Sequence, residues 1–185
     1  QLTRVGRRAG EGYFSADGTK IVFQSERQED NPFYQIYLMD LETGDLERVS
    51  PGRGKTTCAW IHPDGVHVMF SSTHHDPEAK KKQEEELAKR AAGKGSRYSW
   101  SFDEHYDIYE ADTDGNILRK LTDALGYDAE GSWSPDGSSV VFASNRHAYQ
   151  GSLSEEEQKI FKNDQSYFMD LYRMDADGGN LRRLT

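Results

Sequence analysis

Short stretches of the sequence resemble catalytic motifs, but none of these motifs is complete. The run Gly52-Arg53-Gly54-Lys55-Thr56 resembles the end of a phosphate-binding loop, yet that motif needs a glycine five positions before Gly54, where Val49 stands. The sequence contains no Gly-x-Ser-x-Gly and no His-Glu-x-x-His pattern. Its single cysteine, Cys58, falls in a predicted strand, where a small buried thiol is common. We therefore expect no self-contained active site and no enzymatic activity.

Charged and histidine side chains at equivalent positions of the sequence are better candidates for a binding site. They are Glu11, Arg27, His74, His75, Asp128, Glu130, Arg146 and His147. Carboxylates suit a hard cation such as Ca²⁺, whereas histidines suit a transition metal. Ion pairs between the arginines and Glu11 or Glu130, and a site for a peptide or another ligand, are alternatives that stay open. We expect no cofactor, with a structural Ca²⁺ at Glu11, Asp128 and Glu130 as the weaker hypothesis.

The candidate residues occupy equivalent positions because the sequence consists of three copies of one unit. In each copy an aromatic or aliphatic anchor residue precedes an Asp-Gly turn, and a strand containing a phenylalanine follows. The turns are Asp17-Gly18, Asp64-Gly65 and Asp136-Gly137. From the closing Ser or Thr of one unit to the next anchor is 11 positions in every copy, and from the anchor to the phenylalanine is 9. Such constant spacing identifies an internal repeat.

Each unit predicts four short strands. Asp-Gly between two strands favours a hairpin, because the turn needs a positive φ that glycine adopts without a Cβ clash. Four antiparallel strands in roughly 40 to 50 residues, repeated along the chain, are typical of a β-propeller blade. We predict an all-β fold, a β-propeller of three four-stranded blades over residues 4–50, 51–122 and 123–185.

The repeats also resemble a known family. The Ser-Pro-Asp-Gly turn at 134–137, the Ile-Tyr-Leu-Met-Asp strand at 36–40 and the ending Asp-Gly-Gly-Asn-Leu-Arg-Arg-Leu-Thr at 177–185 are similar to the TolB-like (WD-repeat-like) propeller repeats of bacterial proteins. The resemblance implies a periplasmic or secreted location, a ring of six or more blades and a role in binding partner proteins. It also implies an alternative, since similar propellers precede the catalytic domains of some peptidases.

Three blades are half of a six-bladed ring, and an open propeller leaves sheet faces exposed. The chain begins at Leu2-Thr3 and ends at Leu184-Thr185, the same point of the repeat. We therefore expect a homodimer that closes a six-bladed ring, or further blades in a longer chain. The expected function is a non-catalytic scaffold that binds a protein or peptide partner. The alternative is the propeller domain of a larger hydrolase or peptidase, where it gates substrate access.

Two insertions, at about 75–100 and about 148–166, fall between the second and third strands of their blades, so we expect both on the partner-binding face. The first predicts a solvated helix that begins at Asp76 as N-cap and ends before Gly93, followed by an aromatic segment, 98–102, that covers apolar surface. The second predicts a short helix from a capping box at Ser154 through Lys162.

The composition excludes several kinds of partner. With 32 acidic and 23 basic side chains the formal charge is −9, which argues against nucleic acid and anionic membrane surfaces. Mean hydropathy is −0.90, and no stretch approaches the roughly 20 apolar residues of a membrane-spanning helix, so membrane insertion is not expected. One cysteine excludes a disulfide within the chain.

Overall fold

The computed structural model describes residues 4–94, 101–151 and 153–185, which form three four-stranded antiparallel sheets and three helices. The first sheet contains β1 (Arg8–Phe14), β2 (Lys20–Glu26), β3 (Gln35–Asp40) and β4 (Leu46–Arg48). The second contains β5 (Thr56–Ile61), β6 (His67–Ser72), β7 (Asp107–Asp112) and β8 (Ile117–Lys120). The third contains β9 (Ala129–Trp133), β10 (Ser139–Ser144), β11 (Asp170–Asp175) and β12 (Arg182–Arg183). The prediction of an all-β fold is confirmed.

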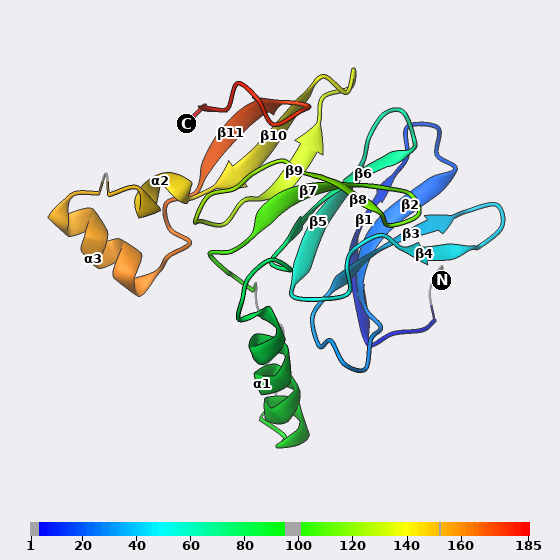
Figure 1. Ribbon diagram of the computed structural model, residues 1–185, viewed down its shortest axis with the longest axis horizontal. Coiled ribbons are helices and arrows are strands. Elements are labelled where there is room, and N and C mark those ends of the chain that lie inside the picture. The colour runs from blue at the N-terminus through cyan, green and yellow to red at the C-terminus, as the bar shows by residue number, and fades with distance from the viewer. Residues whose placement is uncertain (1–3, 95–100, 152) are drawn as a thin grey trace.

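The strands of each sheet follow one another in sequence order, and the sheets lie side by side (Figure 1). The first strand of the middle sheet, β5, contacts both β1 and β9. The first strand of the middle sheet therefore contacts the first strands of both other sheets.

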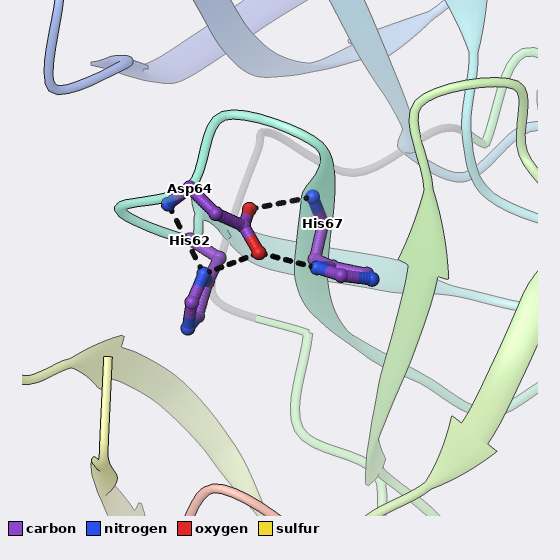
Figure 2. A group of neighbouring side chains, drawn as sticks. All are labelled: His62, Asp64 and His67. Carbon is purple, nitrogen blue, oxygen red and sulfur yellow. Dashed lines mark hydrogen bonds and ion pairs between the residues drawn. The ribbon is translucent and has the colours of Figure 1, made fainter.

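The predicted Asp-Gly turns join the first and second strands of each sheet. Their glycines have φ of 73° at Gly18, 77° at Gly65 and 71° at Gly137, the left-handed region that glycine occupies without strain. In each turn the aspartate accepts a backbone N–H two residues further on. In the middle turn Asp64 Oδ1 accepts the N–H of Val66 at 2.9 Å. It also accepts the N–H of His67 at 3.2 Å (Figure 2).

Two apolar cores join the three sheets. Because alternate residues of a strand point to opposite faces, each sheet contributes one set of side chains to the preceding interface and another to the following one. Between the first and second sheets, Val22 and Ile36 pack with Phe70 and Tyr109. Between the second and third sheets, Met69 and Ile108 of the second sheet pack with Phe142 and Tyr172 of the third. Met69 and Ile108 are the equivalents of Val22 and Ile36.

The same apolar positions are uncovered in the third sheet. Val141, Leu171 and Leu184 are 38%, 46% and 47% exposed. Their equivalents in the first and middle sheets are at most 7% exposed, and these are Val22, Ile36, Val49, Met69, Ile108 and Leu121. The third sheet therefore presents to solvent the face that the other two sheets bury against their neighbours.

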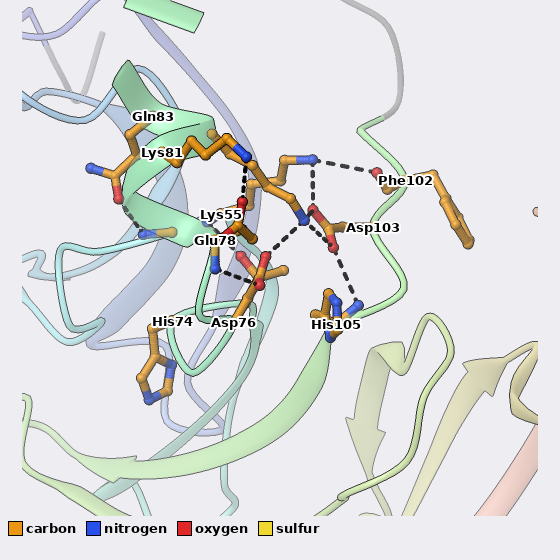
Figure 3. Close-up of polar contacts among 12 residues, drawn as sticks. Lys55, His74, Asp76, Glu78, Lys81, Gln83, Phe102, Asp103 and His105 are labelled. Carbon is orange, nitrogen blue, oxygen red and sulfur yellow. Dashed lines mark hydrogen bonds and ion pairs between the residues drawn. The ribbon is translucent and has the colours of Figure 1, made fainter. Parts of the chain in front are cut away.

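The first insertion forms α1 (Ala79–Ala91), which begins later than predicted. Its N-cap is Glu78, because the chain first forms a turn in which Ala79 N–H donates to the carbonyl oxygen of Asp76 at 3.0 Å. Asp76 still makes the bond typical of a cap, since its Oδ1 accepts the N–H of Glu78 at 2.9 Å, and its Oδ2 pairs with Lys82 at 2.7 Å. The prediction of a solvated helix is wrong for one side of α1. Gln83 is buried and its Oε1 accepts the N–H of Gly54 at 2.8 Å, so the helix is fixed to the loop before β5 (Figure 3).

The second insertion forms α2 (Arg146–Tyr149), which the sequence did not predict, and α3 (Glu155–Asn163). The capping box predicted for α3 is present, with Ser154 accepting from the N–H of Glu157 and Glu157 accepting from the N–H of Ser154. The helices found in the described residues are all too short or too polar to cross a membrane. Of the predicted aromatic cover at 98–102, residues 98–100 lie outside the described residues.

Candidate functional site

The candidate site is built on a bulge that recurs in the first strand of every sheet. At the bulge the register against the second strand shifts, and one residue has a positive φ: 49° at Glu11, 53° at Cys58 and 58° at Glu130. These three residues are equivalent in the repeat. A non-glycine residue in the left-handed region is uncommon, and a bulge redirects the side chain at that position. The fold therefore places one side chain of each sheet at the same level.

Glu11, Cys58 and Glu130 lie where two cavities meet. The larger cavity, of about 460 Å³, is lined by β1, β5, α1, the segment after β2 and residues that precede β7. The smaller, of about 300 Å³, continues between the first strands along Tyr13 and Trp60. Both are lined by the three bulge residues, of which Glu11 and Glu130 are exposed, so a ligand in either cavity can reach these carboxylates.

The bulge residues repel one another electrostatically. Desolvation raises the pKa of Glu130, and the nearby charge of Glu11 adds to the effect. Cys58 Sγ lies 3.3 Å from Glu11 Oε2 and donates to it. Desolvation, only partly opposed by the hydrogen bond with Thr57, raises the pKa of Cys58 to about 12, and Glu11 and Glu130 contribute further. The thiol is therefore protonated at neutral pH and is a poor nucleophile.

Paired charges surround the larger cavity. Buried Glu26 forms ion pairs with Arg8 of β1 and, at 3.1 Å, with Arg90 of α1. Lys55 Nζ lies 3.0 Å from Asp103 and 3.4 Å from the carbonyl oxygen of Phe102 (Figure 3). These ion pairs fix α1 and the segment before β7 to the first strands, so the cavity has a firmly held wall.

Aromatic side chains supply much of the remaining lining. Phe102 stacks on Tyr127 with ring centroids 5.8 Å apart, and Tyr106 meets Tyr127 edge-on at 5.2 Å. Phe33 lies under Lys55 Nζ at 5.5 Å. The cavity thus combines flat apolar walls with carboxylates, an arrangement that suits a ligand with a cationic group.

Two of the sequence-predicted residues form a buried ion pair instead of lining the cavity. Arg146 pairs closely with Asp128, and Ser144 Oγ donates to Asp128 Oδ1 at 2.5 Å. The expected pairing of Arg146 with Glu130 is wrong, because the bulge turns Glu130 toward the cavity while Asp128 faces α2. The calcium hypothesis is left with Glu11 and Glu130, since Asp128 is occupied by Arg146.

The other predicted residues also lie outside the cavity lining. Arg27 is stacked near the rings of Phe23 and Tyr37, with its guanidinium carbon 5.6 and 5.1 Å from their centroids, so its expected pairing with Glu11 is wrong too. His147 Nδ1 lies 2.8 Å from Asp170. His74 and His75 of the middle sheet both pack on the ring of Tyr109. The hydroxyl of Tyr109 lies 3.0 Å from Nδ1 of His75.

Comparisons with known proteins agree on one kind of repeat. No protein-family model matches the chain. A TolB homolog of Chlorobium luteolum is 30% identical over 149 residues, which is 73% of this chain and 34% of the relative. The repeats of the chain are TolB-like. The TolB-like chain also matches the structure of a TolB protein of Agrobacterium tumefaciens, with a TM-score of 0.63 and 21% identity. The match covers all of the TolB-like chain and 51% of the Agrobacterium chain.

A prolyl endopeptidase structure shares the fold at 14% identity, with a TM-score of 0.55 over 96% of the TolB-like chain and 22% of the endopeptidase. The TolB-like chain spans about a third of the curated relative that it matches. These similarities establish the type of repeat and leave the ligand to be inferred from the site.

One group of potential ligands in the TolB-like chain was missed at the level of sequence. His62 and His67 flank Asp64 in the middle Asp-Gly turn, at the other end of the strands from the cavity (Figure 2). A signal was present, because the other two copies have Ser15 and Ser134 in place of His62.

Proposed function

We propose that the chain is a non-catalytic β-propeller scaffold that binds a protein or peptide partner at the face carrying the insertions. The supporting observation is the pair of carboxylates, Glu11 and Glu130, that line the larger cavity. Within the described residues Glu130 has no hydrogen-bond or ion-pair partner. A lysine or arginine side chain of a partner would neutralise both carboxylates while its aliphatic part lay along the aromatic wall. The family resemblance supports a periplasmic or secreted location.

Binding accounts for the cavity better than catalysis does. The only thiol in the chain, Cys58, is held protonated, and no histidine is among the described residues that line the cavity. The carboxylate that neighbours the thiol, Glu11, raises the pKa of Cys58 further and so does not activate it as a nucleophile. The lysine and arginine side chains at the rim have carboxylate partners, so they hold the walls in place.

A peptide-binding measurement tests the proposal. Short labelled peptides rich in lysine and arginine should bind the chain in fluorescence anisotropy, whereas matched acidic peptides should not. The double variant Glu11→Gln/Glu130→Gln should lose this binding. The matched control is Glu42→Gln/Asp114→Asn, which removes two exposed carboxylates from turns outside the cavity lining. Equal binding by both double variants would contradict the proposal.

We also propose that the three sheets are three propeller blades and that a second copy of the chain completes the ring. The exposed apolar face of the third sheet supports this, because the equivalent faces are buried by the next sheet. On the first sheet Phe14 is exposed, whereas its equivalents Ile61 and Trp133 are buried. A two-fold dimer would set the third sheet of each copy against the first sheet of the other and cover both surfaces.

Light scattering tests ring closure. The chain should have twice its monomer mass of 21.1 kDa, and Leu171→Arg/Leu184→Arg should reduce it to the monomer. Leu118→Arg is the control, since Leu118 is also exposed but lies on β8, away from that face. A monomeric wild-type chain would exclude closure by a second copy and favour further blades in a longer chain.

The alternative function is the propeller domain of a larger hydrolase or peptidase that gates substrate access. The structural similarity to a prolyl endopeptidase is the observation behind it, but at 14% identity that similarity concerns the fold alone. A gating role predicts that peptides pass the cavity without measurable affinity. The same anisotropy experiment therefore separates the two functions.

A further inference from the structure

The middle Asp-Gly turn differs chemically from its two copies. In the first and third copies a serine hydroxyl donates to the turn aspartate: Ser15 to Asp17 at 2.6 Å and Ser134 to Asp136 at 2.5 Å. The middle copy has His62 at that position. It also has His67 where the first copy has a lysine and the third a serine. The first and third copies form the same turn without a histidine, so the two imidazoles of the middle copy are not needed for the turn itself.

The carboxylate of Asp64 divides its two oxygens between separate tasks. Oδ1 accepts the backbone N–H groups of Val66 and His67 at 2.9 and 3.2 Å, which holds the turn. Oδ2 lies 2.6 Å from Nδ1 of His67 and 2.9 Å from Nδ1 of His62 (Figure 2). Oδ2 contacts the two imidazoles and not the backbone of the turn, so a cation bound among the three side chains would leave the hydrogen bonds of the turn intact.

Both ring nitrogens of His62 have a neighbour. Nε2 lies 3.3 Å from the carbonyl oxygen of Gly137, which can only accept, so this contact is a hydrogen bond in the tautomer that carries the hydrogen on Nε2. Nδ1 then has the lone pair, and the N–H of Asp64 points to it at 3.2 Å. A lone pair of Nδ1 and a carboxylate oxygen at 2.9 Å repel each other unless a proton or a metal cation lies between them. A metal-binding histidine usually donates its second ring N–H to a backbone carbonyl or a carboxylate, and the carbonyl of Gly137 is in that position for Nε2 of His62.

We propose that His62 Nδ1, Asp64 Oδ2 and His67 Nδ1 bind a divalent transition metal ion of the zinc type. The three ligand atoms lie within 4.8 Å of one another. Two imidazoles and one carboxylate favour Zn²⁺, Co²⁺ or Ni²⁺ over Ca²⁺, which prefers oxygen ligands. Ligand atoms about 2.1 Å from a tetrahedral ion stand roughly 3.4 Å apart, so each ring nitrogen moves away from Asp64 Oδ2 by less than about 1 Å, and the two ring nitrogens approach each other until they are that far apart. The side chains are partly exposed, which allows this movement and leaves room for water ligands.

The site would join two sheets. His62 belongs to the turn of the middle sheet, while its ring packs edge-on against Trp133 of the third sheet with centroids 4.7 Å apart. A cation at Nδ1 fixes the ring that contacts both Trp133 and Gly137. Metal binding is therefore expected to stabilise the junction between these sheets and to change the fluorescence of Trp133.

Titration calorimetry with ZnCl₂ on the whole chain tests the proposal. One zinc ion should bind per chain, and His62→Ser/His67→Lys should weaken binding at least about tenfold. That variant carries the residues of the first copy, so the turn can form. The control His75→Gln/His105→Gln removes two histidines outside the group and should leave the affinity unchanged. CaCl₂ should give no competing heat.

Tryptophan fluorescence gives an independent readout. Co²⁺ should quench wild-type emission, and Trp133→Phe should remove most of this quenching while calorimetry still reports one bound ion. Unchanged zinc affinity in His62→Ser/His67→Lys, or no saturable zinc binding by the wild type, would overturn the proposal. Because the cavity lies at the opposite ends of the strands, either result leaves the peptide-binding experiment interpretable.

Discussion

The middle and third sheets carry the same repeat but differ in what surrounds them. Ile108 is fully buried between two sheets, while the equivalent Leu171 of the third sheet is largely exposed. At the ends of their first and second strands the middle sheet has Thr56 and His74, whereas the third has the ion pair of Asp128 and Arg146. The repeat therefore fixes the backbone of a sheet, and the neighbouring structure decides what each position contributes to stability.

The buried ion pair of the third sheet should give the largest effect. Asp128→Asn leaves the guanidinium of Arg146 buried without its carboxylate, and we expect a loss of about 3–5 kcal/mol in the free energy of unfolding. Urea denaturation measures it. Asp128→Thr/Arg146→His, which imports the pair of the middle sheet, should cost less. An equal loss in both variants would show that the position, and not the unpaired charge, is responsible.

Truncation of equivalent core positions should separate the two sheets next. Ile108→Ala removes a fully buried side chain between two sheets and should cost about 2–5 kcal/mol. Leu171→Ala should cost less than about 1 kcal/mol in the monomer, because that side chain is exposed. Thermal unfolding at low protein concentration makes the comparison. A large loss for Leu171→Ala that grows with protein concentration would indicate that a second copy covers the third sheet.

A smaller effect should appear as a pH dependence that comes from the middle sheet. Desolvation, helped by nearby His75, lowers the pKa of His74 from 6.5 to about 4. The unfolded chain therefore takes up a proton that the folded chain refuses, so stability should fall as the pH drops from about 6.5 to about 4. In His74→Gln the urea midpoint should change less with pH across this range than it does in the wild type. An unchanged slope would mean that other groups cause the loss.

The bulge position should give the smallest effect on stability but a clear chemical difference. With its pKa raised to about 12, Cys58 should react with iodoacetamide at pH 8 far more slowly than the same thiol in the urea-unfolded chain. Cys58→Ala should change the free energy of unfolding little, because the thiol is at the edge of a cavity. A rate equal to that of the unfolded chain would contradict the buried, protonated thiol.

Much of the fold could be predicted from the sequence because its information lies in spacing. Constant distances between the closing Ser or Thr, the anchor and the phenylalanine placed every Asp-Gly turn correctly. The start of α1 could not be read in this way, since Asp76 makes the bond of an N-cap to Glu78 but a turn closed by Ala79 N–H and the Asp76 carbonyl oxygen separates it from the helix.

The candidate site could be predicted only in part. Alignment of the repeats brought Glu11, Cys58 and Glu130 to one level, as the structure has them. It did not separate Glu130 from Asp128, two residues earlier, because regular alternation would send both side chains to the same face. The left-handed residue at the bulge breaks that alternation, and a positive φ at a glutamate leaves no signal in a single sequence.

The recurring bulge also bears on how such a protein could acquire new specificity. Each sheet offers one side chain to the larger cavity, from a backbone position that the cores between sheets do not use. Exchanges at 11, 58 and 130 can therefore change the charge, size and hydrogen bonding of the cavity independently of the packing that holds the sheets together. A combinatorial library restricted to these three positions would sample many binding chemistries on one unaltered framework.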